Sequence, residues 1–141
     1  MVNLHFIEDE CLPSVTKEHV NQYLDQIKNY VREGKSKIHL NRPENRELFD
    51  TYVINEAEAK AILLELEAGD YSHMLKNDNP RFPDEILYVF GKEISLLERY
   101  SESDKQTLEL YIKINKLDDK PIAVEIISLH KALYKLYYPF R

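Results

Sequence analysis

Three residues in the second half of the chain have the right types and spacing to transfer protons around a bound anion. Tyr111 and Lys113 are two positions apart in an alternating apolar segment, so both project from the same side of one strand. His130 follows the next apolar run and stands among basic residues. Because imidazole titrates near neutral pH, this histidine can act as a general base or acid.

Other kinds of site are poorly supported by the sequence. The chain lacks the glycine-rich loops that bind phosphates or dinucleotides, and it lacks a G-x-S-x-G nucleophile motif. The single cysteine has no partner, and the histidines stand too far apart for a metal-ligand motif: His5, His19, His39, His73 and His130. The sequence therefore predicts neither a metal nor a cofactor.

The end of the chain is basic and aromatic, although the whole chain is acidic. Residues 120–141 contain four basic side chains and one carboxylate, a net charge of +3. Since the whole chain has a net charge of −6, the residues before Lys120 carry a net charge of −9. Tyr and Phe residues are interleaved with these cations. Such a mixture suits single-stranded nucleic acid, because the cations meet phosphates and the rings stack on bases.

Length and composition favour one globular domain over residues 1–141. The 141 residues are 43% hydrophobic and 31% charged, with 3 Gly and 6 Pro. No apolar run approaches the length that spans a membrane, and the first residues lack the basic and apolar regions of a signal peptide. With one unpaired cysteine, Cys11, the expected location is the cytoplasm.

The first part of the chain is expected to be mainly helical. Apolar residues at helical spacing predict a helix over 16–33, capped by Ser14 or Thr16 and ended by Gly34. A short, possible edge strand over 37–40 and a short helix over 44–52 follow. Asn55 and Glu58 form a capping box for a helix that ends near Gly69, and residues 77–83 are loop.

In the second part of the chain, the spacing of apolar residues changes to the two-residue alternation that is typical of β-strands. Strands are expected over 86–90, 107–114 and 122–127, with a long hairpin loop over 98–106 and a turn over 117–121. Strands joined in this way are antiparallel. The predicted fold class is α+β, with N-terminal helices packed on a small antiparallel β-sheet. Its parts are an N-terminal extension (1–12), a mainly helical region (13–69), a β-meander (86–130) and a basic aromatic C-terminal segment (131–141).

Several short motifs, in order, resemble MqsR-like toxins of bacterial type II toxin–antitoxin systems. They are Asp70-Tyr71-Ser72, the run from Tyr88 to Ile94, the run from Leu110 to Ile114, and the closing Ser128-Leu129-His130-Lys131-Ala132 with Tyr134 and Tyr138-Pro139-Phe140. The resemblance covers about residues 55–141. It implies a RelE-like fold, metal-independent endoribonuclease activity on mRNA, and an antitoxin encoded in the adjacent gene. The residues through Cys11 have no counterpart in it, and the segment between Ile94 and Thr107 is longer than the tight hairpin usual in this family.

Metal-free RNA cleavage needs a base for the ribose 2′-OH, a cation for the phosphorane and an acid for the leaving 5′-oxygen. The resemblance places catalytic residues at His130 and His73. Lys113 and Lys92 would hold the phosphate, and Tyr111 would position it or relay a proton. Further contacts to the RNA are expected from Lys131, Lys135, Tyr138 and Arg141.

Two alternatives remain open at this point. One is a non-catalytic module on the same fold, which binds RNA or pairs with a partner protein through its acidic helical half. The other is a nuclease that acts only on ribosome-bound mRNA. In each case the expected partners are an antitoxin, single-stranded mRNA or a ribosome, and no membrane.

Overall fold

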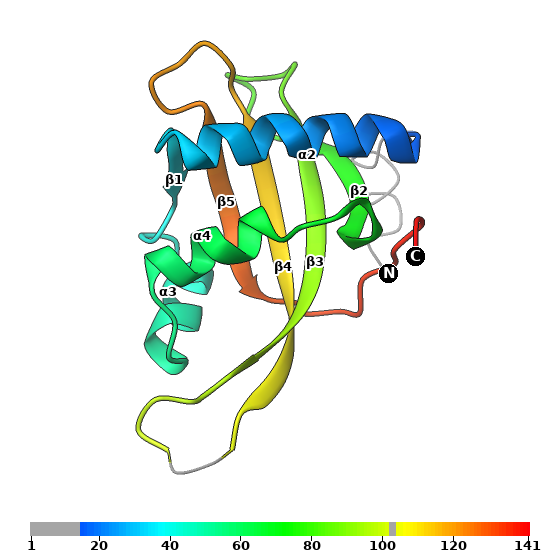
Figure 1. Cartoon of the computed structure of the whole chain (residues 1–141). Coiled ribbons are helices and arrows are strands. Elements are labelled where there is room, and N and C mark those ends of the chain that lie inside the picture. The colour runs from blue at the N-terminus through cyan, green and yellow to red at the C-terminus, as the bar shows by residue number, and fades with distance from the viewer. Residues whose placement is uncertain (1–14, 102–103) are drawn as a thin grey trace.

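The computed structural model describes residues 15–101 and 104–141. The expected N-terminal extension, Cys11 and the alternative cap Ser14 lie outside the described residues. The elements follow in this order (Figure 1): α2 (Lys17–Arg32), β1 (Ser36–Ile38), α3 (Pro43–Thr51), α4 (Glu56–Leu64), the 3-10 turn η1 (Ala68–Asp70), β2 (Tyr71–Lys76), β3 (Ile86–Leu96), β4 (Gln106–Lys116) and β5 (Val124–Lys131).

One sheet of five strands organises the chain in the order β1-β5-β4-β3-β2. The strands β2 to β5 form the antiparallel meander, and the α+β class predicted from the sequence is confirmed. β1 is an edge strand, as expected, but it runs parallel to β5. The parallel pairing is possible because helices and three further strands separate β1 from β5 along the chain.

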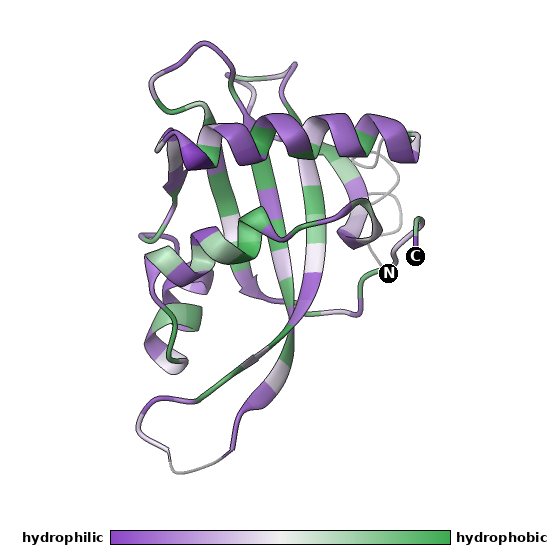
Figure 2. Cartoon of the chain, in the orientation of Figure 1, coloured by the Kyte–Doolittle hydropathy of each residue, from purple (hydrophilic) through white to green (hydrophobic). Residues whose placement is uncertain are grey.

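α2 runs across the strands and covers one face of the sheet (Figure 1). Thr16 caps its start by accepting a hydrogen bond from the His19 backbone N–H at 3.1 Å, and Gly34 follows its end with a φ of +76°. The apolar stripe of the helix faces the sheet while its polar side faces outward (Figure 2), and the buried residues are Val20, Tyr23, Leu24, Ile27 and Val31. They pack on the even-numbered residues of β4, from Leu108 to Ile114, in a single core.

The segment between α4 and β3 differs from the sequence prediction. The capping box of Asn55 and Glu58 is present, but α4 ends at Leu64 rather than near Gly69. Residues 71–76 form β2, a strand that the sequence did not predict. His73 therefore lies on a strand and not in a loop after a helix. The mixed polarity of 71–76 gave no alternation to detect, and pairing with β3 supplies the order.

The strands β3 and β4 are longer than predicted. β3 continues to Leu96 and β4 begins at Gln106, and the resulting twisted hairpin projects beyond the helices (Figure 1). Arg99 ties this connection to α3 by donating a hydrogen bond to the Phe49 carbonyl at 3.0 Å. The connection between the strands runs over residues 97–105, shifted by one residue from the expected loop over 98–106, and it lies at the end of an extended hairpin.

After β5, residues 132–141 form a C-terminal segment that crosses the sheet on the side away from α2 (Figure 1). Gly91 of β3 makes this crossing possible, since a Cβ there would lie 2.1 Å from the Tyr138 hydroxyl oxygen. Tyr138 also donates a hydrogen bond to Glu109 at 2.6 Å. Among the described residues, no helix has both the length and the apolar character needed to cross a membrane.

Candidate functional site

The four predicted catalytic residues share one surface of the sheet, which we call the open face. It is the face opposite α2, reached by the odd-numbered residues of β4. Tyr111 is paired with His130 of β5. Val89 of the central strand β3 pairs with Lys113 of β4 on one side and with His73 of β2 on the other. His73 and His130, which are 57 positions apart in the sequence, thus share this face with Tyr111 and Lys113 because of the register of the strands.

Tyr111 and His130 form a stacked pair, with ring centroids 5.2 Å apart and planes 13° from parallel. The His130 Nδ1 lies 2.9 Å from the Lys131 carbonyl oxygen. A carbonyl can only accept, so Nδ1 carries the hydrogen and Nε2 keeps its lone pair when the ring is neutral. The geometry therefore leaves Nε2 able to accept a proton.

Lys113 and His73 interact across β3. Burial lowers the pKa of His73, and the charge of Lys113 lowers it further. Ser72 Oγ shares a hydrogen bond with His73 Nδ1 at 2.9 Å. His73 is consequently a neutral ring at neutral pH, suited to accept a proton or a hydrogen bond but not to neutralise a phosphate.

Arg42 joins the site from the loop between β1 and α3, and the sequence analysis missed it. Burial raises the pKa of the Tyr111 hydroxyl, and the nearby positive charge of Arg42 acts in the opposite direction. Tyr111 is thus a neutral hydrogen-bond donor within reach of the positive charge of Arg42. No periodic pattern marks Arg42, because the position of this loop depends on the pairing of β1 with β5.

Asn45 of α3 fixes the part of β5 that leads to His130. Its side chain is fully buried, donates to the carbonyls of His39 and Ile127 at 2.9 Å each, and accepts from the Leu129 N–H at 2.8 Å. Beyond Ile38, the edge of β5 has no β1 residue to pair with. Asn45 takes the place of that strand partner at Ile127 and Leu129, just before the stacked histidine.

The open face also separates two of the predicted catalytic residues. His73 is on β2 and His130 is on β5, three strand spacings apart, or about 14 Å between backbones. A scissile phosphate and its two flanking oxygens span much less than this distance. The candidate site around His130 therefore consists of Tyr111, Lys113 and Arg42. His73 lies at the margin of this site.

Three of the predicted RNA contacts already have partners within the chain. Lys92 lies on the α2 side of the sheet, opposite Lys113, and its Nζ is 3.3 Å from Asp70. Tyr138 lies under the Arg141 guanidinium at 3.7 Å from the ring centre, and Arg141 also pairs with Asp70 at 3.2 Å. Lys92 therefore lies on the other face of the sheet from Lys113 and His130, and one side of the Tyr138 ring is covered by Arg141.

The remaining two predicted RNA contacts, Lys131 and Lys135, are exposed. Two carboxylates of the open face are engaged, Glu109 with Tyr138 and Glu125 with His39 at 3.2 Å, whereas Glu93, which pairs with Glu109 in the strand register, is exposed. In the described part of the chain, no group of His, Cys, Asp and Glu has the arrangement of a metal site. An anion bound next to Tyr111 would meet the charges of Lys113 and Arg42.

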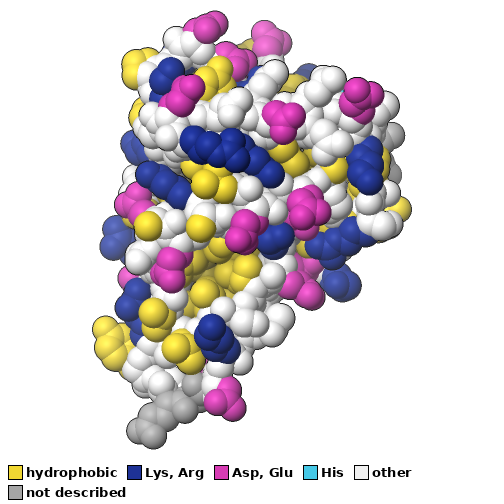
Figure 3. Space-filling model, viewed as in Figure 1, with side chains coloured by type: hydrophobic (Ala, Val, Ile, Leu, Met, Phe, Trp, Pro, Cys, Tyr) yellow, Lys and Arg dark blue, Asp and Glu magenta, His cyan; other side chains and the backbone are white. Residues whose placement is uncertain are grey.

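A hollow of about 790 Å³ adjoins this cluster through Arg42. It is large enough for a nucleotide and is walled by the loops before β3 and before β5; its other lining residues include His39, Asn77, Asn79, Phe82, Asn115, Lys120 and Glu125. On the α2 side, by contrast, basic and acidic side chains are interspersed over the visible surface (Figure 3). The visible surface on that side therefore has no continuous positive patch that would attract a polyanion such as RNA.

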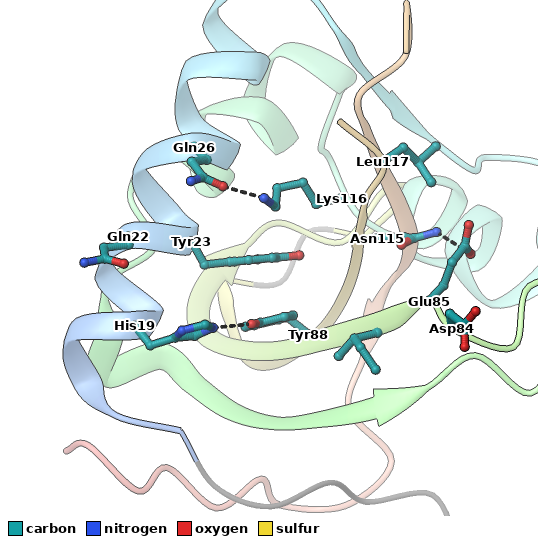
Figure 4. A pocket seen from close by; sticks show the side chains of 11 residues that line it. His19, Gln22, Tyr23, Gln26, Asp84, Glu85, Tyr88, Asn115, Lys116 and Leu117 are labelled. Carbon is teal, nitrogen blue, oxygen red and sulfur yellow. Dashed lines mark hydrogen bonds between the residues drawn. The ribbon is translucent and has the colours of Figure 1, made fainter. Parts of the chain in front are cut away.

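A second hollow, of about 460 Å³, lies between α2 and the ends of β3 and β4 (Figure 4). Its polar groups are largely paired with one another: His19 Nε2 is 2.7 Å from the Tyr88 hydroxyl, and Lys116 donates to Gln26. Tyr23 stacks on Tyr88 at 3.6 Å, and its enclosed hydroxyl has no partner among the described residues. These contacts support a structural role for His19, as the sequence suggested.

Comparison of the chain with protein-family models, with curated proteins and with solved structures gave no match. The resemblance to MqsR-like toxins therefore stays a prediction.

Proposed function

We propose that the chain is a metal-independent endoribonuclease that cleaves single-stranded mRNA. The observation that carries the proposal is the stacked pair of Tyr111 and His130 with Lys113 and Arg42 on the same open face. Two cations, one proton acceptor and one neutral hydroxyl are the groups that phosphodiester cleavage by a ribose 2′-OH requires.

In the proposed reaction, Nε2 of His130 takes the proton of the 2′-OH. The 2′-oxygen then attacks the phosphorus in line, and Lys113 and Arg42 stabilise the charge on the phosphorane oxygens. The bond from phosphorus to the 5′-oxygen breaks as Tyr111 donates its proton to that oxygen. The products are a 2′,3′-cyclic phosphate and a free 5′-OH, and the proton on His130 returns to Tyr111 through solvent. DNA, which lacks the 2′-OH, is not a substrate.

The experiment is cleavage of a single-stranded RNA in EDTA. We expect His130→Ala to lower the cleavage rate about 100-fold or more, because a positioned general base contributes about 10²–10⁴. His19→Ala, which removes a histidine bonded to Tyr88 on the α2 side, is the matched control and keeps the wild-type rate. Undiminished cleavage by His130→Ala, or cleavage that requires added magnesium, would contradict the mechanism.

The order of the motifs described above further supports a toxin of a type II toxin–antitoxin module. Induced expression should then arrest growth, and coexpression of the neighbouring open reading frame should restore it. Growth arrest that the neighbour never relieves contradicts the module.

Two other outcomes correspond to the alternatives. RNA binding without cleavage, and without growth arrest, indicates a non-catalytic module. Cleavage seen only on translating ribosomes indicates a ribosome-dependent nuclease, which ribosome profiling during expression would reveal.

A further inference from the structure

The C-terminal segment exposes three large side chains that the fold does not use. Leu133, Tyr134 and Tyr137 are 84%, 82% and 76% exposed. Apolar and aromatic groups left in water to this extent, close together on one short segment, are typical of a surface that binds something.

The backbone that carries these side chains is held in place by Glu109 of β4. The Glu109 carbonyl accepts from the Ala132 N–H at 2.8 Å, and its carboxylate accepts from the Leu136 N–H at 3.3 Å and from Tyr138 at 2.6 Å. The contacts fall before, between and after the exposed rings. The rings therefore project from a fixed support, and ordering them costs a ligand little conformational entropy.

The far end of the segment is fixed as well. Phe140 stacks on Tyr71 with centroids 5.8 Å apart, and Arg141 donates to the Gly69 carbonyl at 3.0 Å. Anchors of this kind lie on both sides of Tyr134 and Tyr137, so the segment is fixed before and after the exposed rings.

The charge of the segment indicates the chemistry of its ligand. Residues 131–141 contain Lys131, Lys135 and Arg141 and no carboxylate. Lys131 and Lys135 are exposed, and Lys135 stands between the two tyrosines in the sequence. Alternating cations and free rings match the phosphates and bases of a single strand.

We propose that Tyr134 and Tyr137 form a base-stacking platform for single-stranded RNA, with Lys131 and Lys135 on its phosphates. The platform begins directly after His130 and crosses the open face at Gly91, which is paired with Tyr111. It thus holds nucleotides next to the proposed point of cleavage. The choice of RNA as ligand rests on the proposed function, and an acidic peptide is the competing occupant.

The test is the affinity for a labelled RNA of about 12 nucleotides, blocked by 2′-O-methyl groups so that cleavage plays no part, measured by fluorescence anisotropy at low salt. Tyr134→Ala and Tyr137→Ala should each weaken binding about 5- to 100-fold, while Tyr→Phe at either position retains most of the affinity because stacking survives. Tyr100→Ala is the matched control, since Tyr100 is also fully exposed but lies on the β3–β4 connection.

The lysine contacts have their own readout in the salt dependence of binding. Lys135→Gln should reduce the slope of log K against log salt by about 0.7, the value for one phosphate of a single strand. Lys17→Gln on the exposed side of α2 should leave the slope unchanged.

The outcomes separate this proposal from the proposed catalysis. Tyrosine-dependent RNA binding without any cleavage supports the platform and contradicts the nuclease. Cleavage by the wild type together with undiminished RNA binding by both Tyr→Ala variants overturns the platform alone. Failure of the wild type to bind RNA, with capture of an acidic peptide by the same tyrosines, also overturns it.

Discussion

Single side chains on the open face differ in their protonation state at neutral pH, and the structure shows why. Burial and the charge of Lys113 lower the pKa of His73, so its ring is neutral. Burial raises the pKa of Tyr111, so its hydroxyl stays protonated although Arg42 opposes the shift. Lys113 thus has a neutral donor two residues away on its own strand and a neutral acceptor across β3, and each arises from the same cause, partial burial on a sheet surface.

The lowered pKa of His73 predicts how stability depends on pH. The unfolded chain takes up a proton near pH 6.5, whereas the folded chain does so only at lower pH. The free energy of unfolding should therefore fall as pH decreases from about 7.5 to about 5.5. In His73→Asn this contribution is absent, so urea titrations of the variant should show a smaller fall.

Lys113→Gln serves as the companion variant. Because burial is the larger cause of the shift, removing the lysine charge should reduce the pH sensitivity only in part. An equal fall in the wild type and His73→Asn would contradict this assignment, whatever the behaviour of the lysine variant.

At the scale of elements, local patterns predicted most of the helices and central strands. α2, the capping box of α4 and the alternation of β4 depend on neighbours in sequence, and all three are present. The parallel pairing of β1 and the whole of β2 depend on contacts with distant strands, which leave no period in the sequence. The same distinction holds in the site, where Tyr111 and Lys113 were predicted to share a face but the loop residue Arg42 was missed.

Asn45 gives a test of how one element positions another. Asn45→Ala leaves two carbonyls and one N–H without their partner, so we expect a loss of about 2–4 kcal/mol in the free energy of unfolding. Hydrogen exchange should also quicken at the Leu129 N–H, which lies next to His130. Asn21→Ala on the exposed side of α2 should change stability by less than about 0.5 kcal/mol, and a similar value for Asn45→Ala would mean that α3 does not hold β5.

At the scale of the whole molecule, the two ends of the sheet are joined by the C-terminal segment. It leaves β5 after Lys131, crosses the open face over Gly91 and reaches η1 next to the edge strand β2, where Arg141 and Lys92 share Asp70. The basic end of the chain is therefore used in two ways. Tyr138, Phe140 and Arg141 are bound to the fold, whereas Tyr134, Lys135 and Tyr137 face solvent.

Gly91 is the position at which this arrangement can be disturbed without touching the segment itself. In Gly91→Ala the new Cβ would stand 2.1 Å from the Tyr138 hydroxyl and 2.5 Å from the Leu136 side chain, so the segment must move away from β3. We expect a loss of about 1–3 kcal/mol in stability, faster tryptic cleavage after Lys131 and Lys135, and weaker RNA binding. Gly69→Ala, whose Cβ would meet Arg141 at an ordinary 3.6 Å, is the matched control and should behave like the wild type.

If the two variants were digested at the same rate, the segment would not depend on Gly91. If Gly91→Ala were digested faster yet bound RNA normally, the fixed support would not be what gives Tyr134 and Tyr137 their affinity.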